Sequence, residues 1–286
     1  MVLEKIKPFG YCNGVNVAIK KLSRIIKTNP NNQIHLIGWI VHNKQINEEL
    51  LLNKNVFLHE GLDKKVIVKK ILKKTNNKNK LIFVFSTHGT DPQAIKEVKK
   101  YNCQYHNFVC PYIKLIISKI EKAIEKGYKV YFFGKKNHHE TLCIKHTYKK
   151  VKVYAKKEDV NQDDFYKKYV ICQTTANYQN FFATKKWFKN AIFEETICNF
   201  CKAKQKQAMQ LKTSNSIIVI SDKKSNNGLI IFKILKQRNK YVYFLSPNRK
   251  TILKIKKTPK IYVFTSSSIS QEQANMILKN HLNKLQ

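Results

Sequence analysis

Long apolar runs, acidic residues and glycine are all scarce in this sequence of 286 residues. No apolar run is long enough to span a bilayer, which argues against a transmembrane segment. The first residues, MVLEKIKPFGYC, show no signal or transit peptide. A Walker A loop and a GxGxxG fingerprint are also missing, so the common nucleotide-binding folds are not indicated. From these absences we expect a cytoplasmic protein with no membrane partner.

Acidic residues are too few to balance the basic ones, since 18 Asp and Glu stand against 55 Lys and Arg, for a net charge of +37. Such a charge makes nucleic acid the first partner to consider. The lysines are dispersed, however, arginine is rare, and the joint abundance of Lys, Asn, Ile, Tyr and Phe is typical of an A/T-rich coding sequence. We therefore predict no specific nucleic-acid partner, with duplex DNA binding that moderate salt abolishes. Sequence-preferring, salt-resistant binding in a mobility-shift titration would contradict this prediction.

The seven cysteines are odd in number and scattered through a chain whose hydrophobic fraction, 43%, is ordinary. This usage favours a reducing compartment over a disulfide scaffold. Three of them open helical patterns, in YCNGVNVAIKKLSRII, VCPYIKLIISKIEKAI and ICNFCKAKQKQAMQL. These are Cys12, Cys110 and Cys198, spaced 98 and 88 residues apart.

One cysteine at a helix start is most simply a small buried hydrophobe. The alternative is a thiolate, which the helix dipole and the unpaired N–H groups favour. Recurrence at the same place in three repeats supports the thiolate. The remaining four cysteines lack this regularity, and we predict that they are buried small side chains, although Cys201 forms a local CxxC with Cys198. These four are Cys103, Cys143, Cys172 and Cys201.

Apolar strands follow each of the three cysteines. The first strand of each repeat lies in QIHLIGWIVHN, KVYFFGKKNHHE or SIIVISDKKSNN, and the last lies in LIFVFSTHGTDP, KYVICQTTANY or KIYVFTSSSIS, with a short strand between them. Such runs, with helical patterns between them, are typical of α/β modules with parallel sheets. We predict three similar α/β modules at 1–109, 110–195 and 196–286, in a pseudo-threefold arrangement around a central cleft.

Polar residues follow the strands, at the edge where open α/β sheets bind their ligands. Three histidines lie there, and with the hydroxyl and amide side chains they predict a pocket rich in donors, suited to a phosphate or diphosphate. The residues are His42, His88, His138, Thr174, Thr175, Ser225, Asn226, Asn227 and Ser268.

Three thiolates in a reducing compartment bind zinc or an iron–sulfur cluster. Structural zinc usually takes four ligands at short spacing, yet a Cys₃His site with His42, His88 or His138 stays open. A cubane cluster on three cysteines leaves one iron without a protein ligand. That iron would act as a Lewis acid while the cluster supplies electrons.

Eight short motifs in order resemble those of the 4-hydroxy-3-methylbut-2-enyl diphosphate reductase family, over nearly the whole chain. GYCNGVNVAI resembles the family's GFCxGVxRAI, FSTHGTDP resembles FSAHGVSP, NHHE resembles GHPE, and KSNN resembles NSSN. The segments VHN, CP, QTT and IC match directly. Together the eight motifs are highly specific for this family, an iron–sulfur enzyme family of the last step of the non-mevalonate isoprenoid pathway.

The resemblance implies a [4Fe–4S] cluster at the centre of the three modules, on Cys12, Cys110 and Cys198. It implies reductive removal of the allylic hydroxyl in two one-electron steps, to isopentenyl and dimethylallyl diphosphate. Glu140 would be the proton donor, helped by Thr174, and a ferredoxin or flavodoxin would supply the electrons. Diphosphate would be bound by His42, His88, His138, Ser225, Asn226, Asn227 and a serine near position 268.

Several positions depart from the family pattern. The loop GHAGHPE is GKKNHHE here, the second serine of SSN is Asn226, and TTNRQ after the third cysteine is CKAKQ. The family's ASAP is SSIS, which leaves Ser268 or Ser270 for the diphosphate. Asp91, the acidic competitor of Glu140, is better interpreted as the cap of the next helix. The alternative function is a basic nucleic-acid-binding protein with a structural metal site.

Overall fold

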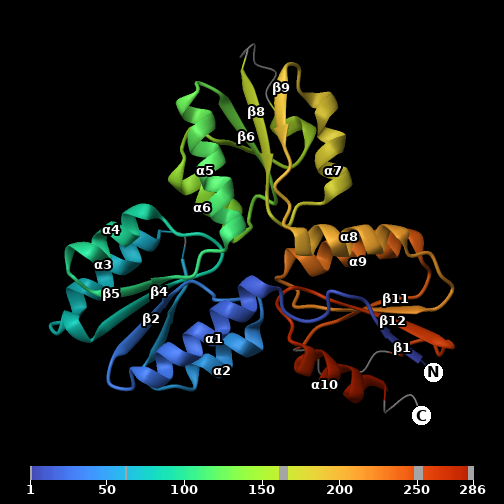
Figure 1. Ribbon diagram of the computed structural model, residues 1–286, viewed down its shortest axis with the longest axis horizontal. Coiled ribbons are helices and arrows are strands. Elements are labelled where there is room, and N and C mark those ends of the chain that lie inside the picture. Colours follow the sequence, from blue (N-terminus) through green and yellow to red (C-terminus); the bar gives the residue numbers. More distant parts are fainter. Residues whose placement is uncertain (1, 62, 161–166, 248–253, 283–286) are drawn as a thin grey trace. The chain divides into compact units, whose positions relative to one another are not determined.

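The computed structural model describes residues 2–61, 63–160, 167–247 and 254–282. Its strands form three four-stranded sheets in which every pair of neighbours is parallel (Figure 1). The prediction of three α/β modules is confirmed.

Sheet A contains β1 (Val2–Lys5), β12 (Lys260–Thr265), β10 (Ser216–Ile220) and β11 (Val242–Leu245). Sheet B contains β3 (Val56–His59), β2 (Gln33–Ile37), β4 (Leu81–Phe85) and β5 (Gln104–Asn107). Sheet C contains β7 (Lys152–Tyr154), β6 (Lys129–Phe133), β8 (Lys168–Cys172) and β9 (Ala191–Glu194).

The strand order is the same in all three sheets. In sheets B and C it is β3-β2-β4-β5 and β7-β6-β8-β9, and sheet A repeats it as β11-β10-β12-β1. The N-terminal strand β1 therefore takes the place in sheet A that β5 and β9 take in the other two sheets. Each of these edge strands is followed along the chain by one of the three repeated cysteines. The cysteine repeat thus has a structural basis in the path from an edge strand to a helix.

The chain folds into two compact units. Unit 1 comprises residues 1–16, 41–48 and 198–286, and it holds sheet A. Unit 2 comprises residues 17–40 and 49–197, and it holds sheets B and C. The module boundaries drawn from the repeats remain a prediction.

Sheet A is covered on both faces. One face packs on α8 (Asn199–Gln210) and α9 (Asn226–Arg238), through Ala208, Ile231 and Leu235. The other packs on α10 (Gln271–Leu282), through Ala274 and Ile277. Coverage on both sides explains why the strand β10 reads as the continuous apolar run SIIVI, buried throughout.

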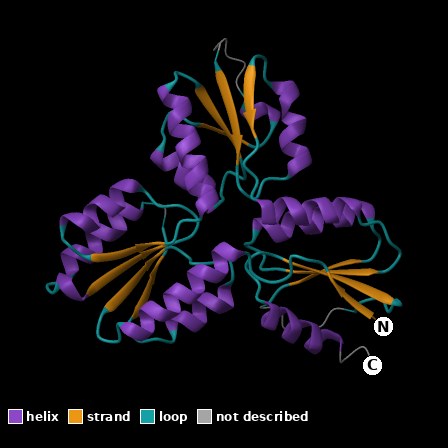
Figure 2. Cartoon of the chain, in the orientation of Figure 1, coloured by secondary structure: helices purple, strands orange, loops and turns teal. Residues whose placement is uncertain are grey.

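Helices also cover sheets B and C (Figure 2). In sheet B, α3 (Lys64–Lys74) and α4 (Pro92–Lys100) cover one face. In sheet C, α5 (Pro111–Glu125) and α6 (His139–Thr147) pack on one face, and α7 (Tyr178–Ala183) lies against aromatic side chains of β6 and β9. The remaining helices are α1 (Asn13–Thr28), α2 (Lys44–Leu51) and three 3₁₀ turns at Lys78–Lys80, Lys157–Asp159 and Thr184–Trp187. None of the described helices combines the length and apolar character needed to cross a bilayer.

Candidate active site

The three repeated cysteines stand at helix starts, as predicted. Cys110 and Cys198 are the N-cap residues of α5 and α8, and Pro111 fills the first position of α5. Cys12 directly precedes α1, and its Sγ accepts a hydrogen bond from the backbone N–H of Val15 at 3.4 Å. All three thiols are partly exposed. A helix start presents N–H groups and a positive dipole end, which stabilise a thiolate.

The other cysteines differ in their surroundings. Cys103, Cys172 and Cys201 are buried, as predicted, whereas the prediction is wrong for Cys143, which is partly exposed beside a small cavity. None of the seven cysteines, all of which are described, forms a disulfide. Burial raises the pKa of Cys172 to about 12 and also raises the pKa of Cys103 and Cys143. These thiols stay protonated at neutral pH, whereas metal ligation needs the thiolate.

The repeated cysteines are the candidate ligands of any metal or cluster that this chain binds. In the described part of the chain, no three His, Cys, Asp or Glu side chains form a ready-made metal-binding group. The three partly exposed thiols nevertheless have the donor chemistry that an iron–sulfur cluster requires, because thiolates are its usual ligands. The residues present therefore fit such a cluster.

In unit 1, Asn43 connects two predicted binding segments. It follows His42 at the start of α2 and is fully buried. Its Nδ2 donates to the carbonyl of Ser268 at 2.9 Å and to Oε1 of Gln273 at 2.7 Å. The segment that carries His42 is thereby fastened to the loop that carries Ser268. Sequence reasoning quoted Asn43 within VHN but assigned it no role.

The predicted anion-binding segment of unit 1 begins helix α9. Ser225 is its N-cap, and the side chains of Asn226 and Asn227 are buried in its first turn. Both polar atoms of the Asn227 amide are buried without a hydrogen-bond partner among the described residues, although the side chain is only 2% exposed. An unpaired buried amide is costly, and a bound polar ligand would satisfy it.

Gly228 brings this helix start close to Ser221, the residue that directly follows strand β10. A Cβ built on Gly228 would lie 1.9 Å from Oγ of Ser221, so any larger residue would displace the turn.

The structure distinguishes the two serines left open by the sequence. The Oγ of Ser270 accepts a hydrogen bond from the backbone N–H of Gln273 at 2.9 Å, within the first turn of α10. Ser268 is 3% exposed, and its Oγ lies 3.2 Å from that of Ser266. Because the Ser270 hydroxyl already stabilises a helix start, Ser268 is the better candidate for a ligand contact.

In unit 2, Glu140 and Thr174 form a closed hydrogen-bonded pair. One carboxyl oxygen of Glu140 accepts from the backbone N–H of Thr174 at 2.8 Å, and the other accepts from its hydroxyl at 2.7 Å. Glu140 is 1% exposed in the first turn of α6. Burial raises its pKa to about 7, although both hydrogen bonds from Thr174 oppose the shift. A carboxyl group with this pKa holds and releases a proton near neutral pH.

Three histidines of unit 2 lie next to one another. The His88 ring centroid is 6.4 Å from that of His138 and 6.2 Å from that of His139. Burial, then repulsion from neighbouring cationic groups, lowers the pKa of His138 to about 3 and that of His88 well below its usual value. The Nδ1 of His138 accepts from the backbone N–H of Glu140 at 3.3 Å, which leaves the ring proton on Nε2. Both rings are neutral at physiological pH, and each retains one N–H donor.

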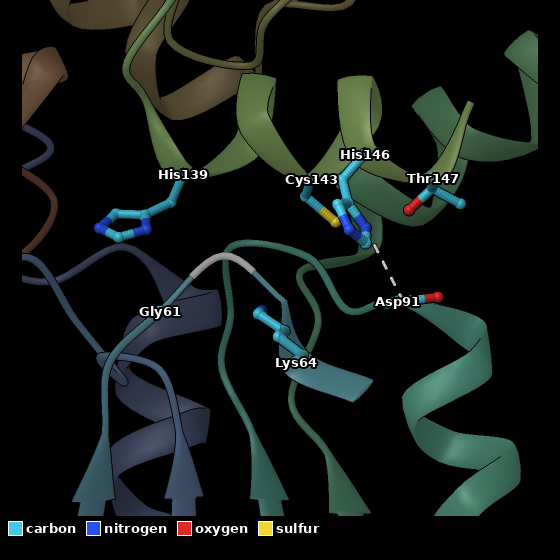
Figure 3. A pocket seen from close by; sticks show the side chains of 7 residues that line it. All are labelled: Gly61, Lys64, Asp91, His139, Cys143, His146 and Thr147. Carbon is cyan, nitrogen blue, oxygen red and sulfur yellow. Dashed lines mark ion pairs between the residues drawn. The ribbon is translucent and has the colours of Figure 1, made fainter. Parts of the chain in front are cut away.

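A partly buried lysine, Lys64, supports the loop that carries His88. The ammonium of Lys64 donates to the carbonyl of Gly89 and lies 3.4 Å from Oγ of Ser86. Beside it is a cavity of about 20 Å³, enough for about one water molecule. Figure 3 shows the ammonium directed toward helix α6, where Cys143 and His146 line the same cavity. Burial lowers the pKa of Lys64, and Cys143 and Asp91 oppose this. The sequence alone did not indicate a role for Lys64, because nothing in its local pattern separates it from the other lysines.

Asp91 caps helix α4, as predicted. Its carboxylate accepts from the backbone N–H of Gln93 at 2.9 Å, and Pro92 follows at the first helical position. We expect Asp91→Ala to lower the free energy of unfolding by about 0.5–2 kcal/mol in urea titrations, because the cap is lost, and to leave turnover unchanged. Asp91→Asn should retain most of the stability. A hundredfold loss of turnover at unchanged stability would instead make Asp91 catalytic.

Comparison with known proteins identifies the family. The model of the LytB protein family matches residues 3–281. The chain belongs to the LytB protein family. It is 30% identical over 264 residues to the 4-hydroxy-3-methylbut-2-enyl diphosphate reductase of Malacoplasma penetrans, covering 87% of each chain. It is 26% identical to the reductase of that name from Fusobacterium nucleatum over 290 residues, 96% of this chain but only 33% of that longer protein.

A solved structure shares the fold of this LytB-family chain. The E-1-hydroxy-2-methyl-but-2-enyl-4-diphosphate reductase from Plasmodium falciparum aligns with a TM-score of 0.81 at 20% identity, over 98% of this chain and 87% of that one. Together with the family match, these relatives confirm the family predicted from the eight motifs. The ligand contacts of individual residues remain predictions.

Proposed function

We propose that this chain reduces 4-hydroxy-3-methylbut-2-enyl diphosphate to isopentenyl and dimethylallyl diphosphate. Membership of the LytB family supports the reaction, since the relatives with this enzyme name match most of the chain. The single structural observation that carries the proposal is the buried carboxyl of Glu140, paired with Thr174 and poised to hold a proton near pH 7. Removal of a hydroxyl as water requires such a group.

The diphosphate would be bound mainly by neutral donors. His88 and His138 each retain one N–H at neutral pH, because burial keeps both rings uncharged. In unit 1, the unpaired buried amide of Asn227 and the first turn of α9 add further donors. N–H groups at a helix start suit phosphate oxygens. His42, Ser225, Asn226 and Ser268 complete the proposed set.

Cys12, Cys110 and Cys198 would hold a [4Fe–4S] cluster. When bound, the cluster supplies single electrons and a Lewis-acidic iron without a protein ligand. The electrons would come from a ferredoxin or flavodoxin in a reducing compartment such as the cytoplasm. The overall balance is one substrate, two electrons and two protons, giving one diphosphate product and one water.

Glu140 would deliver a proton to the reacting part of the substrate. In its protonated form the carboxyl group donates its O–H, and in its ionised form both oxygens accept hydrogen bonds from Thr174. Thr174 thus stabilises the carboxylate that remains after proton transfer, which eases the release of the proton. Burial works in the opposite direction and keeps the carboxyl group protonated before the reaction. The two effects together set an acid strength suited to neutral pH.

Metal and sulfide analysis tests the proposal against the alternative. Protein purified without oxygen should be coloured, with a broad visible absorbance from thiolate-to-iron charge transfer, and should contain both iron and acid-labile sulfide. A colourless protein containing zinc would favour the structural metal site of the alternative function. Zinc in place of iron would therefore overturn the proposed cofactor.

The reaction should slow above neutral pH. Because burial raises the pKa of Glu140 to about 7, the protonated fraction falls about tenfold per pH unit above that value. We expect kcat/KM to fall with this slope when it is measured at a fixed potential of the reductant. Among the ionisable groups around Glu140, Cys143 and Cys172 interact electrostatically with its carboxyl group, and His138 accepts a hydrogen bond from its backbone N–H.

Thr174→Val provides the control for this profile. The substitution removes the hydroxyl hydrogen bond that lowers the pKa of Glu140. The fall of kcat/KM with rising pH should therefore begin at a higher pH than in the parent. Stability gives a second check. The folded chain keeps the Glu140 proton that the unfolded chain loses above about pH 4.5, so this group's contribution to stability decreases as pH rises from about 4.5 to 7. If the pH dependence of kcat/KM is the same in Thr174→Val as in the parent, Glu140 is not the group whose ionisation causes it.

A further inference from the structure

Lys204 is a fully buried lysine in unit 1. It lies in helix α8, which begins at Cys198, and its side chain is 0% exposed. Its ammonium donates to the carbonyl of Thr265, and it lies 3.0 Å from the Thr265 hydroxyl and 5.0 Å from the ring centroid of Phe200. Across the described residues, no carboxylate pairs with it. Lysine is almost never fully buried without a partner, so a specific role must compensate.

Thr265 connects Lys204 to the segment that carries Cys12. The Thr265 hydroxyl also accepts a hydrogen bond from the backbone N–H of Gly10 at 2.9 Å. Two residues later, the backbone N–H of Cys12 donates to the carbonyl of Ser267 at 3.3 Å. Thr265 ends strand β12, and the loop that follows it carries Ser268. One ammonium therefore joins the helix begun by Cys198, the approach to Cys12 and the Ser268 loop.

An apolar side chain would fill this space without the penalty of burying a charge. Burial disfavours the charged form and lowers the pKa of Lys204 to about 7, and Cys201 opposes the shift. An apolar side chain could not donate to the Thr265 carbonyl, so Lys204 supplies a hydrogen-bond donor at this position and not only bulk.

We propose that Lys204 is a positioning residue of the cluster site, which holds the Cys12 segment and the Ser268 loop against the Cys198 helix through Thr265. The inference rests on the proposed function for the identity of the bound group. The hydrogen bonds themselves belong to the protein without a cofactor, so the proposal is tested there first.

Hydrogen–deuterium exchange of the cofactor-free protein is the deciding measurement. In Lys204→Met, peptides that span residues 9–12 and 265–269 should exchange at least tenfold faster than in the parent, while β11 and α9 keep their protection. Lys206→Met removes the same charge from an exposed position of the same helix and should change nothing. Lys204→Arg should restore most of the protection, because guanidinium also donates to the Thr265 carbonyl.

Thr265→Val supplies a second route should Lys204→Met fail to fold. It deletes the hydroxyl shared by Lys204 and Gly10, and it should speed exchange in the same two segments, whereas Thr265→Ser should not. Exchange that rises uniformly across unit 1, or no difference between Lys204→Met and Lys206→Met, would overturn the proposal.

After cluster assembly, iron should be lost faster from Lys204→Met than from Lys206→Met. Equal rates of iron loss in the two variants would overturn the positioning role at the cluster. If the parent protein itself assembles no cluster, the proposed function fails, and the exchange comparison still decides whether Lys204 joins the three segments.

Discussion

Glu140→Gln is expected to lower turnover by about a hundredfold to ten-thousandfold, the usual loss when a general acid is removed. The substitution preserves the shape of the side chain, so an amide oxygen still accepts from the Thr174 backbone N–H. The amide cannot release a proton to the substrate. We expect cluster content, fold and KM to stay near those of the parent, with kcat reduced when a strong chemical reductant supplies the electrons.

The competing interpretation of Glu140 is structural. Its position in the first turn of α6 places a carboxylate near the positive end of the helix dipole, which is worth roughly 0.3–1 kcal/mol of stability. Burial argues against that role, because the raised pKa leaves much of the group uncharged at neutral pH. Near-normal product formation by Glu140→Gln, at cluster content matched to the parent, would show that the proton comes from another group.

Cys110→Ser is expected to abolish the stable cluster, and Cys12→Ser and Cys198→Ser should do the same. A serine hydroxyl does not ionise at neutral pH and is a poor ligand for iron in a cluster, whereas the cysteine thiolate is the usual one. Iron and acid-labile sulfide per chain should fall to a small fraction of the parent value after anaerobic reconstitution.

Cys103→Ser and Cys143→Ser are the matched controls. Both residues lie in unit 2 with Cys110, and burial raises the pKa of both thiols, so neither is prepared to bind iron. We expect full cluster content in both variants, even where the buried hydroxyl of Cys103→Ser lowers stability. Full cluster retention in Cys110→Ser would contradict the ligand assignment, as would its loss in Cys103→Ser.

Nine of the twelve described strands could be predicted: six are largely apolar runs that the fold buries, and three are short strands that recur at the same place in each repeat. The other three, β1 (VLEK), β5 (QYHN) and β9 (AIFE), are four-residue edge strands in which no residue is fully buried, so their sequences carry no clear strand pattern. The pairing of β1 with β12 joins the two ends of the chain, a long-range contact that no local pattern reveals. The helix starts at Cys110 and Cys198 were predictable, because a turn residue followed at once by helical periodicity is a local signal.

The sequence names candidate site residues, whose ligand contacts remain predictions, but it does not indicate the electrostatics of the site. The capping role of Asp91 follows from its place before Pro92, which sequence alone shows. The raised pKa of Glu140 could not be predicted, because it depends on how completely the tertiary structure excludes water. Lys64 and Lys204 were invisible among the many lysines, which are usually exposed. Only the fold distinguishes these two from the rest.

The most direct measurement is conversion of 4-hydroxy-3-methylbut-2-enyl diphosphate by protein prepared and assayed without oxygen. With a strong one-electron reductant, the parent protein should form both isopentenyl and dimethylallyl diphosphate, identified by mass and chromatography against standards. Product should require the reductant and should be absent with Cys110→Ser at equal protein concentration. No product from parent protein that carries a full complement of iron and sulfide would contradict the account.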